Sequence, residues 1–386
     1  MTARRSRVRR ERMRDSLDVA RSWRAGLWRW LGLAAALLTL LSAGFRPSLS
    51  TADVGGERLS HPQGLELTAT LAGPTVAAPA AVIYDVDSGR MLFEKNSHER
   101  RAVGSTTKLA TALVALRHLD LQQTITVGPE VENVAGTVIG LEAGDQATVE
   151  KLLYGTLLTS GNDAALALAA GTGGSVEQFV NWMNDLAGEL GLRDTHFVNP
   201  HGLDAPDHYS SAYDLALLAQ AALRNPIIAK AVATPETRID DWRFINRNEL
   251  LGQYPGVDGV KTGTTDEAGE CLIVSATRDG HRVIAVVLGS QDRYADGRAL
   301  LDFYYARYAW LPADAPANRF SALPPDAAGR ARYLTAAAQE SMFVAGWERP
   351  WVRCGVEVDV GLAGGVARCR SAGFVLAQVP LEVRAP

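Results

Sequence analysis

Ser105 and Lys108 stand three positions apart at the start of an apolar segment, "GSTTKLATALVALRHL", which covers residues 104–119. That spacing puts both side chains on one face of a helix. A serine hydroxyl is a strong nucleophile only beside a base, and a lysine amine is such a base only when its pKa is lowered. The pair therefore indicates nucleophilic catalysis. Taken alone, it is more typical of a helix-capping serine followed by a solvated lysine.

Two other polar stretches have residue types that complete such a site. "TSGND" at 159–163 is predicted as a tight turn before an alanine-rich helix, and "DGVKTGTT" at 258–265 as a strand followed by small hydroxyl residues. Taken alone, each stretch fits a structural role as well as a catalytic one. The first fits a helix cap, and the second fits an edge-strand turn. Together the three stretches follow the order S-x-x-K, S-x-N, K-T-G, which marks penicillin-binding proteins and serine β-lactamases. The residues in this set are Ser105, Lys108, Ser160, Asn162, Lys261, Thr262 and Gly263.

Residues 79 to about 310 resemble the low-molecular-weight penicillin-binding proteins that act as D-alanyl-D-alanine carboxypeptidases. Beyond the three motifs, "NPHGLDAPDHYSSAYDLALLAQAAL", "NRNELL" and "DGVKTGTTDEAGECLIVSAT" are similar to that subfamily rather than to class A β-lactamases. The family often has His, Tyr or Phe after K-T-G, where this chain has Thr264, so the resemblance gives that side chain no role. The C-terminal stretch that ends "FVLAQVPLEV" resembles the family's C-terminal β domain.

The resemblance implies a role for each residue of the reacting centre. Ser105 attacks the carbonyl of the penultimate D-Ala of a peptidoglycan stem, and Lys108, buried and largely neutral, takes its proton. Ser160 and Asn162 relay the proton to the leaving amine and hold the substrate amide. An oxyanion needs two convergent donors, which by resemblance are the backbone N–H groups of Ser105 and Thr264.

The resemblance also implies a site for the terminal carboxylate of the substrate. Lys261 and Thr262 supply a cation and a hydroxyl for it, and Lys261 helps to keep the general base neutral. Arg247, in "NRNELL", is a candidate second contact for the same carboxylate. A surface salt bridge of Arg247 with Glu249 or Asp258 is an equally good alternative.

The resemblance thus predicts a serine-type carboxypeptidase that is inhibited by β-lactams, and two other functions use the same motifs. A β-lactamase needs a dedicated deacylating base, which class A enzymes supply as a Glu in an E-x-x-L-N loop between the second and third motifs. This sequence has no such loop. A penicillin-binding sensor or scaffold would acylate and then stall, and every residue needed for acylation would also serve it.

The elements that must position these residues follow from the sequence pattern. A β-hairpin is predicted around "DSG" within residues 79–95 and a short strand at "TITV". Helices are predicted at 106–119, 148–158, 163–171, 175–190, 211–224 and 296–309, and strands at 257–262, 270–277 and 281–288. A hairpin first, a helical middle and strands last exclude a parallel βαβ repeat. The predicted fold is α+β, an antiparallel sheet with helices on both faces plus a helical subdomain, of the β-lactamase/transpeptidase type that the resemblance implies.

The N-terminal part is predicted to attach the protein to a membrane. Residues 1–29 hold ten Arg against three acidic residues, and residues 30–45 carry no charge. We expect 30–45 to be a single transmembrane anchor, with a cleaved signal peptide as the alternative. In both cases the catalytic domain lies outside the cytoplasm. It is either attached to the cell membrane by the anchor or secreted after signal cleavage. The basic segment then sets the orientation of the chain in the membrane and binds anionic lipid, and no nucleic-acid partner is expected.

Beyond the predicted anchor the chain divides into a tether, a catalytic domain, a linker and a small β-rich domain. Residues 46–78 have no sustained periodicity and many Ser, Gly, Thr and Pro, which is typical of a tether. The catalytic domain is predicted over 79–311. A proline-bearing linker then leads to a small β-rich domain over 325–386, whose short strands are punctuated by Gly.

The three cysteines and seven histidines indicate structure rather than metal binding. Cys354 and Cys369 flank a predicted hairpin, and our hypothesis pairs them in a disulfide, which suits an exported domain. Cys271 lies in an apolar strand pattern and is predicted to be core. No H-E-x-x-H motif occurs, so no metal and no cofactor are expected. His201, in "NPHGLD", is predicted to order its loop rather than to act as a base.

Overall fold

The computed structural model describes residues 73–172, 174–313, 322–323, 332–336, 340–358, 364–371 and 374–384. The predictions for residues 1–29, 30–45 and most of the tether lie outside this range. Within it, no single helix is long and apolar enough to cross a membrane. The helices Ala212–Arg224 and Pro226–Ala233, bent by 105° relative to each other, meet this length and composition requirement only when the two are taken together.

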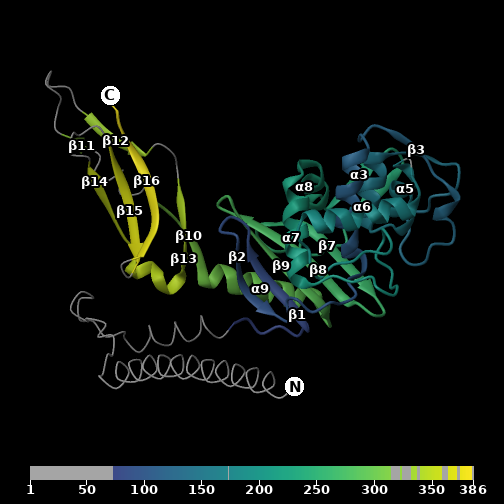
Figure 1. The fold of residues 1–386 in the computed structure, drawn as a ribbon, viewed down its shortest axis with the longest axis horizontal. Coiled ribbons are helices and arrows are strands. Elements are labelled where there is room, and N and C mark those ends of the chain that lie inside the picture. The colour runs from purple at the N-terminus through teal and green to yellow at the C-terminus, as the bar shows by residue number, and fades with distance from the viewer. Residues whose placement is uncertain are drawn as a thin grey trace, which may run out of the picture. The chain divides into compact units, whose positions relative to one another are not determined.

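A five-stranded antiparallel sheet lies at the centre of the catalytic part, in the order β2-β1-β9-β8-β7 (Figure 1). Its strands are β1 (Ala80–Asp85), β2 (Arg90–Lys95), β7 (Val257–Thr265), β8 (Gly269–Arg278) and β9 (His281–Ser290). All of its pairings are antiparallel. Strand β1 of the N-terminal hairpin therefore pairs with β9, about 200 residues later in the chain, and the predicted antiparallel sheet is confirmed.

Helices cover both faces of this sheet, as predicted. On β1, Ala81 and Ile83 are buried in one core with Leu300 of α9 (Arg293–Arg307). The alternate residue, Val82, is buried in a second core with Leu215 of α7 (Ala212–Arg224). Because successive strand residues point to opposite faces, the apolar runs of the sheet need a helix on each side.

The packed domain begins slightly before residue 79. Val76 and Ala78 are buried in the core on the α9 face. The backbone N–H groups of Ala77 and Ala78 donate to the buried carboxylate of Asp296, at 2.8 and 2.7 Å. The last residues of the predicted tether are thus fixed to the helix that closes the domain.

The helical region packs beside the sheet and contains two of the three motifs. Its elements are the 3₁₀ helix η1 (Gly104–Thr107), α3 (Lys108–His118), α4 (Val149–Tyr154), the π-helix η3 (Gly155–Thr159), α5 (Asn162–Gly171) and α6 (Val176–Glu189). Ser175 caps the start of α6, because its side chain accepts a hydrogen bond from the Gln178 N–H, and such caps favour a helix start. The predicted helices are all present, with ends that differ by a few residues.

Two elements between α7 and β7 escaped prediction. They are α8 (Pro226–Ala233) and the hairpin of β5 (Glu236–Ile239) and β6 (Trp242–Ile245). The sequence did carry a signal for α8, because Asn225 caps it and Pro226 occupies its first turn. The smaller pair of β3 (Thr124–Thr126) and β4 (Gln146–Thr148) was predicted for one strand only.

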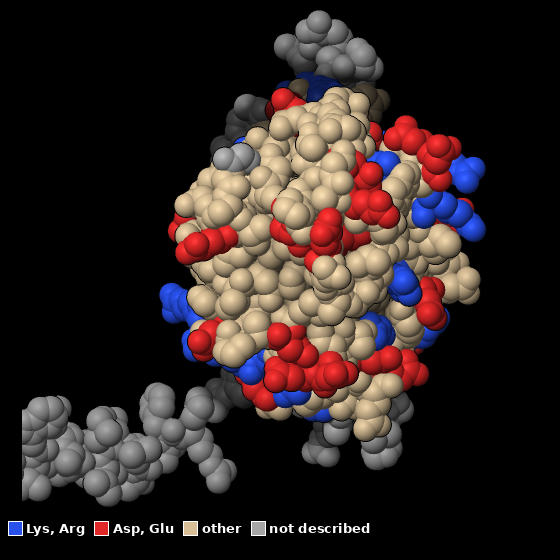
Figure 2. Space-filling view, turned by 90° about the vertical axis from the view of Figure 1, so that its right-hand side faces the viewer, with Lys and Arg blue, Asp and Glu red and all other residues tan. Residues whose placement is uncertain are grey.

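The exterior of the helical region is acidic. Residues 119–211 contain thirteen Asp or Glu and only two Lys or Arg. Figure 2, which shows this end of the catalytic part, has more acidic than basic side chains on its surface. Much of the negative charge that follows the basic N-terminal segment therefore belongs to this region.

The described residues after 307 form mostly β-structure, as predicted for 325–386, with one 3₁₀ helix, η4 (Gly346–Trp351). The strands are β10 (Tyr308–Pro312), β11 (Ala322–Leu323), β12 (Arg332–Ala336), β13 (Ser341–Ala345), β14 (Arg353–Val358), β15 (Gly364–Ser371) and β16 (Phe374–Arg384). They form a five-stranded sheet, β11-β12-β16-β15-β14, and the pair β10-β13. Cys354 and Cys369 lie opposite each other on β14 and β15 and form the predicted disulfide. Cys271 is buried and unpaired, also as predicted.

Candidate active site

The first motif forms the turn that leads into α3. Ser105 lies in η1, and Lys108 is the first residue of α3. The Lys108 side chain is fully buried, and its Nζ lies 2.7 Å from the Ser105 Oγ. Nζ also donates to the Asn162 Oδ1 at 2.6 Å and to the His201 carbonyl oxygen at 2.8 Å. Three segments far apart in the sequence therefore converge on one amine.

This environment suits a base. Burial lowers the pKa of Lys108 well below its ordinary value, and the charge of Lys261 lowers it further, against the opposing effect of Asp163. Two fixed acceptors, the Asn162 amide oxygen and the His201 carbonyl, take two N–H groups of the amine. When the amine is neutral, its lone pair is left for the Ser105 hydroxyl. The predicted burial of Lys108 is confirmed.

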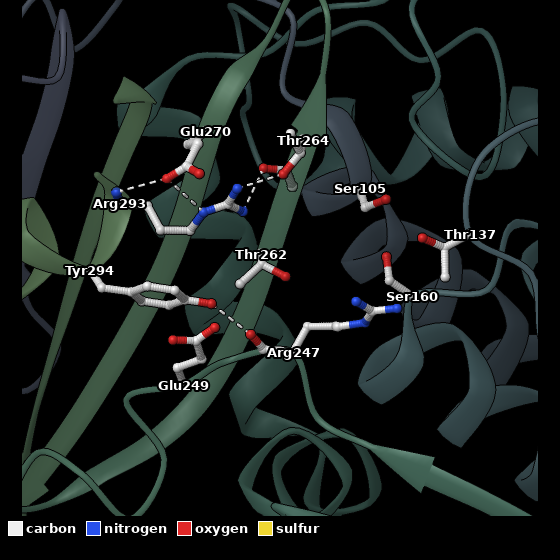
Figure 3. A pocket seen from close by; sticks show the side chains of 11 residues that line it. Ser105, Thr137, Ser160, Arg247, Glu249, Thr262, Thr264, Glu270, Arg293 and Tyr294 are labelled. Atoms are coloured by element: carbon white, nitrogen blue, oxygen red, sulfur yellow. Dashed lines mark hydrogen bonds and ion pairs between the residues drawn. The ribbon is translucent and has the colours of Figure 1, made fainter. Parts of the chain in front are cut away.

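The second motif is an irregular turn between two helices. The π-helix η3 is followed directly by Ser160, whose φ of 68° is in the left-handed region, and the Gly161 N–H donates to the Gly155 carbonyl at 2.9 Å. Such conformations are costly for residues other than glycine and tend to occur at functional sites. The turn places the Ser160 side chain in the pocket, near that of Ser105 (Figure 3).

The third motif lies on β7, the edge strand of the sheet, which passes very close to η1. A Cβ atom on Gly263 would lie 2.6 Å from the Val103 carbonyl oxygen, and one on Gly104 would lie 2.9 Å from the Thr264 nitrogen. Both positions therefore require glycine. This contact brings together the backbones of Ser105 and Thr264, whose N–H groups were predicted to hold an oxyanion.

Three positively charged side chains lie close together at the third motif: Lys261 itself, Arg247 and Arg293. Lys261 is buried, and its Nζ donates to the Thr262 carbonyl at 3.0 Å. Burial, together with the charges of Arg247 and Arg293, lowers the pKa of Lys261 to about 7. An anion bound in front of these cations would favour the charged form of the lysine.

Arg247 faces the pocket rather than a neighbouring carboxylate. Its guanidinium points toward Ser160 (Figure 3). Asp258 pairs instead with Arg282 at 2.8 Å, and among the described residues Arg247 forms no ion pair with Glu249. The surface salt bridge that competed with a substrate contact is therefore not formed.

Arg293, at the start of α9, is a residue of the site that the sequence motifs did not reveal. Its Nη1 donates to the carbonyls of Gly263 and Cys271, at 2.9 and 3.2 Å. Its Nη2 donates to the Thr264 Oγ1 at 2.5 Å, and its Nε is 3.2 Å from the Glu270 carboxylate. Arg293 therefore holds the end of β7 and occupies the Thr264 hydroxyl, for which the sequence gave no role.

The loop with His201 lies beside the Lys108 amine, and the role of His201 matches the prediction. Burial lowers the pKa of the His201 ring to about 3, and its Nδ1 accepts the Leu203 N–H at 3.2 Å. The Asn199 Oδ1 accepts the Gly202 N–H at 2.7 Å, which fixes the turn. His201 thus orders its loop and acts on Lys108 through its carbonyl, a contact that no side-chain motif predicts.

These segments enclose a pocket of about 270 Å³ (Figure 3). It is lined by Ser105, Thr137, Ser160, Arg247, Glu249, Thr262, Gly263, Thr264, Glu270, Arg293 and Tyr294. The remaining predicted site residues, Lys108, Asn162 and Lys261, are buried beside it. The structure thus brings all nine predicted residues together. No cluster of three or more metal-ligating side chains occurs in the part of the chain that the structure describes.

Comparisons with known proteins agree with this arrangement. The family model described as "D-alanyl-D-alanine carboxypeptidase" (Peptidase S11) matches residues 67–292. The D-alanyl-D-alanine carboxypeptidase DacF of Bacillus subtilis is 41% identical over 248 residues, which are 61% of this chain and 64% of that protein. DacF and the D-alanyl-D-alanine carboxypeptidase DacA of Escherichia coli are thus each matched over a little under two thirds of their own length.

Solved structures extend the likeness. The Streptomyces K15 DD-transpeptidase is 34% identical, with a TM-score of 0.57, and the match covers 60% of this chain and 98% of that one. Penicillin binding protein 6B of Escherichia coli is 31% identical, with a TM-score of 0.65, over 80% of this chain and 96% of that one. The fold prediction is thus supported beyond the catalytic part. Since the family model covers more than half of the residues, the chain belongs to the Peptidase S11 family of D-alanyl-D-alanine carboxypeptidases.

Proposed function

We propose that the protein is a serine-type D-alanyl-D-alanine carboxypeptidase that removes the terminal D-Ala from peptidoglycan pentapeptide stems. The observation that carries the proposal is the Lys108 amine, which is buried and lies 2.7 Å from the Ser105 Oγ. A serine hydroxyl with a neutral amine at hydrogen-bond distance is equipped for acyl transfer. The family supplies the substrate class.

Acylation uses both sides of the pocket. Ser105 Oγ attacks the carbonyl carbon of the penultimate D-Ala while Lys108 accepts its proton. The charge on the carbonyl oxygen is stabilised by the N–H groups of Ser105 and Thr264. The C–N bond then breaks, and the leaving amine takes a proton relayed from Lys108 through Ser160. Asn162 holds the base on one side and the substrate amide on the other.

The terminal carboxylate distinguishes the substrate from an internal peptide. In the proposal it binds in front of Lys261 and the Thr262 hydroxyl, and Arg247 is the second contact. Charge-assisted hydrogen bonds to a carboxylate are roughly twice as strong as neutral ones. Water subsequently hydrolyses the acyl-enzyme with Lys108 again as base, and a β-lactam would occupy the same serine as a slowly released mimic.

Attachment to the cell membrane through residues 30–45 is part of the proposal. Its support is the sequence alone: sixteen uncharged residues that follow a segment with ten Arg. The catalytic domain would then work on the extracytoplasmic side, where peptidoglycan lies. The alternative is secretion after signal cleavage. Mass spectrometry of the mature protein from membranes distinguishes them, because a chain that begins after residue 45 contradicts the anchor.

One experiment tests the catalytic proposal against its alternatives. The chain is mixed with a diacyl-Lys-D-Ala-D-Ala peptide and, separately, with a penicillin, while D-Ala release and protein mass are followed. We expect sustained D-Ala release that is lost in Ser105→Ala. A permanent penicillin adduct without peptide turnover would instead identify a sensor, and fast penicillin hydrolysis without peptide cleavage would identify a β-lactamase.

A further inference from the structure

One wall of the pocket is a loop that no sequence motif marks. Residues 133–141 form neither helix nor strand, yet Thr137 lines the pocket. Figure 3 shows its hydroxyl directed toward Ser105 and Ser160, across the pocket from β7. That hydroxyl has no hydrogen-bond partner among the residues that the structure describes, so it is free to meet a ligand.

Two consecutive residues of the second motif hold this loop in place. The buried carboxylate of Asp163 accepts three N–H groups in a row: Ile139 at 2.9 Å, Gly140 at 2.8 Å and Leu141 at 3.1 Å. A carboxylate that accepts several backbone N–H groups makes strong, charge-assisted hydrogen bonds. The loop therefore has a fixed position on the C-terminal side of Thr137.

Asn162 fixes the other side of the loop. Its backbone N–H donates to the Thr137 carbonyl at 2.7 Å, and its Nδ2 donates to the Ala135 carbonyl at 2.6 Å. A Cβ on Gly136, whose φ is +83°, would lie 2.9 Å from that Nδ2. Because the same Asn162 side chain accepts from Lys108, the loop and the general base share one support.

We propose that Thr137 is a further substrate-contacting residue of this site, and that Asp163 is the positioning residue that holds it there. The inference rests on the proposed function. The group that Thr137 recognises is a backbone amide of the stem peptide, upstream of the scissile bond. With the scissile carbonyl at Ser105 and the carboxylate at Lys261, the stem peptide upstream must leave between β7 and the loop. Its backbone amides need partners there, and a threonine hydroxyl can both donate and accept.

Asp163 also acts on the base electrostatically, which gives its role a separate signature. The groups around the Lys108 amine are Ser105 on η1, Asn162 and Asp163 on α5, the His201 segment and Lys261 on β7. The charge of Asp163 raises the pKa of Lys108 against burial and Lys261. Removal of that charge should therefore move the acid limb of acylation to lower pH, which loss of packing alone would not do.

The first test is a matched pair of variants in the full-length chain. Thr137→Val keeps the shape and removes the hydroxyl, whereas Thr137→Ser keeps the hydroxyl. We expect kcat/KM for D-Ala release to fall about 3- to 10-fold in Thr137→Val, the worth of one neutral hydrogen bond, and to stay within about 2-fold in Thr137→Ser. An unchanged kcat/KM in Thr137→Val would overturn the substrate contact.

The second test is Asp163→Asn, with Asp145→Asn as the control. Asp145 is a half-buried carboxylate that accepts the Glu142 N–H in a solvent-exposed hydrogen bond beside the same loop. We expect Asp163→Asn to lose at least about 10-fold in kcat/KM, to shift its acid limb to lower pH, and to abolish the further effect of Thr137→Val. Additive losses with an unmoved acid limb would contradict the positioning role. Should Asp163→Asn not fold, Gly136→Ala displaces the loop from the other side and must abolish the Thr137→Val effect in the same way.

Acylation by benzylpenicillin, which also carries an amide beside its reactive carbonyl, is measured in parallel. If the wild-type chain acylates but releases no D-Ala, the carboxypeptidase proposal fails. The Thr137 variants then decide the inference through their acylation rates. Equal rates in the wild type and Thr137→Val would refute it on that assay also.

Discussion

The two sides of the pocket use lysine in opposite ways. On the helical side, defined by Ser105, Lys108, Ser160 and Asn162, the lysine amine contacts a hydroxyl, an amide oxygen and a carbonyl from three separate segments. On the sheet-edge side, defined by Lys261, Thr262, Gly263 and Thr264, the lysine amine donates to the carbonyl of the next residue of its own strand and has arginines as charged neighbours.

The difference separates proton transfer from charge recognition. Directed acceptors fix the orientation of the Lys108 lone pair, which a base requires. Clustered cations fix no orientation but create a positive field, which an anionic group of the substrate requires. Both lysines are buried, so burial alone does not distinguish the two roles. Their neighbours do.

Replacement of Lys108 should have the largest effect. In Lys108→Arg the side chain stays protonated and cannot accept the proton of Ser105. Acylation by a penicillin should therefore fall by about 10³-fold or more, with the fold intact. Mass spectrometry of the adduct over time measures the rate, and thermal unfolding checks the fold. Lys230→Arg, an exposed lysine on α8, is the matched control. Acylation at the wild-type rate in Lys108→Arg would remove the distinction between the two sides.

Replacement of Lys261 should have a smaller effect that depends on the substrate. In Lys261→Met, kcat/KM for a peptide with a free terminal carboxylate should fall by about 10²-fold, which corresponds to one lost charge-assisted hydrogen bond. With the C-terminally amidated peptide, the ratio of wild type to variant should shrink toward one. An equal loss on both peptides would mean that Lys261 acts on the chemistry rather than on the carboxylate.

Arg247 should contribute less again, because its side chain is exposed to solvent. In Arg247→Ala we expect KM to rise about 10-fold with kcat nearly unchanged, the pattern of lost uniform binding. Arg243→Ala serves as control, since it breaks an exposed ion pair with Glu236 on the β5–β6 hairpin. A fall in kcat without a change in KM would mean that Arg247 acts on the chemical step rather than on substrate binding.

The last prediction concerns the two limbs of the pH profile of kcat/KM, whose shifts should change the rate at neutral pH least. Activity should rise with pH as Lys108 loses its proton, and fall again as Lys261, whose pKa burial lowers to about 7, loses the charge that binds the carboxylate. In Lys261→Met the alkaline limb should vanish. The acid limb should move to higher pH, because a cation that lowers the Lys108 pKa is gone. An unmoved acid limb would show that the two lysines are not coupled.

Much of this site was predictable because its signals are local. The three-residue spacing of Ser105 and Lys108, the glycines of the turns and the continuous apolar runs of β8 and β9 each depend on neighbours within one element. These signals located the three motifs, the sheet and the helices. The α8 helix also had a local signal, an Asn-Pro start that was not used, so its absence from the prediction was an error of interpretation.

The contacts that give the motifs their chemistry connect residues far apart in the chain. The His201 carbonyl lies 93 residues from Lys108, and the Arg293 guanidinium lies 29 residues from the Thr264 hydroxyl that it binds. Thr137 and the amides held by Asp163 carry no motif at all. Periodicity and spacing hold no information on such pairs, because their distances depend on how helices pack against the sheet.

By itself the sequence determined which side chains could act as nucleophile, base and cation, because residue types and local spacing fix the available chemistry. It also determined an antiparallel sheet with helices, because apolar periodicity fixes which elements can form. Only the tertiary structure decided that Arg247 faces the pocket instead of a carboxylate, that Arg293 supports the edge strand, and that Asp163 holds the loop over Ser105. The physical reason is that hydrogen bonds and charge effects act over a few ångströms in space, whatever the separation along the chain.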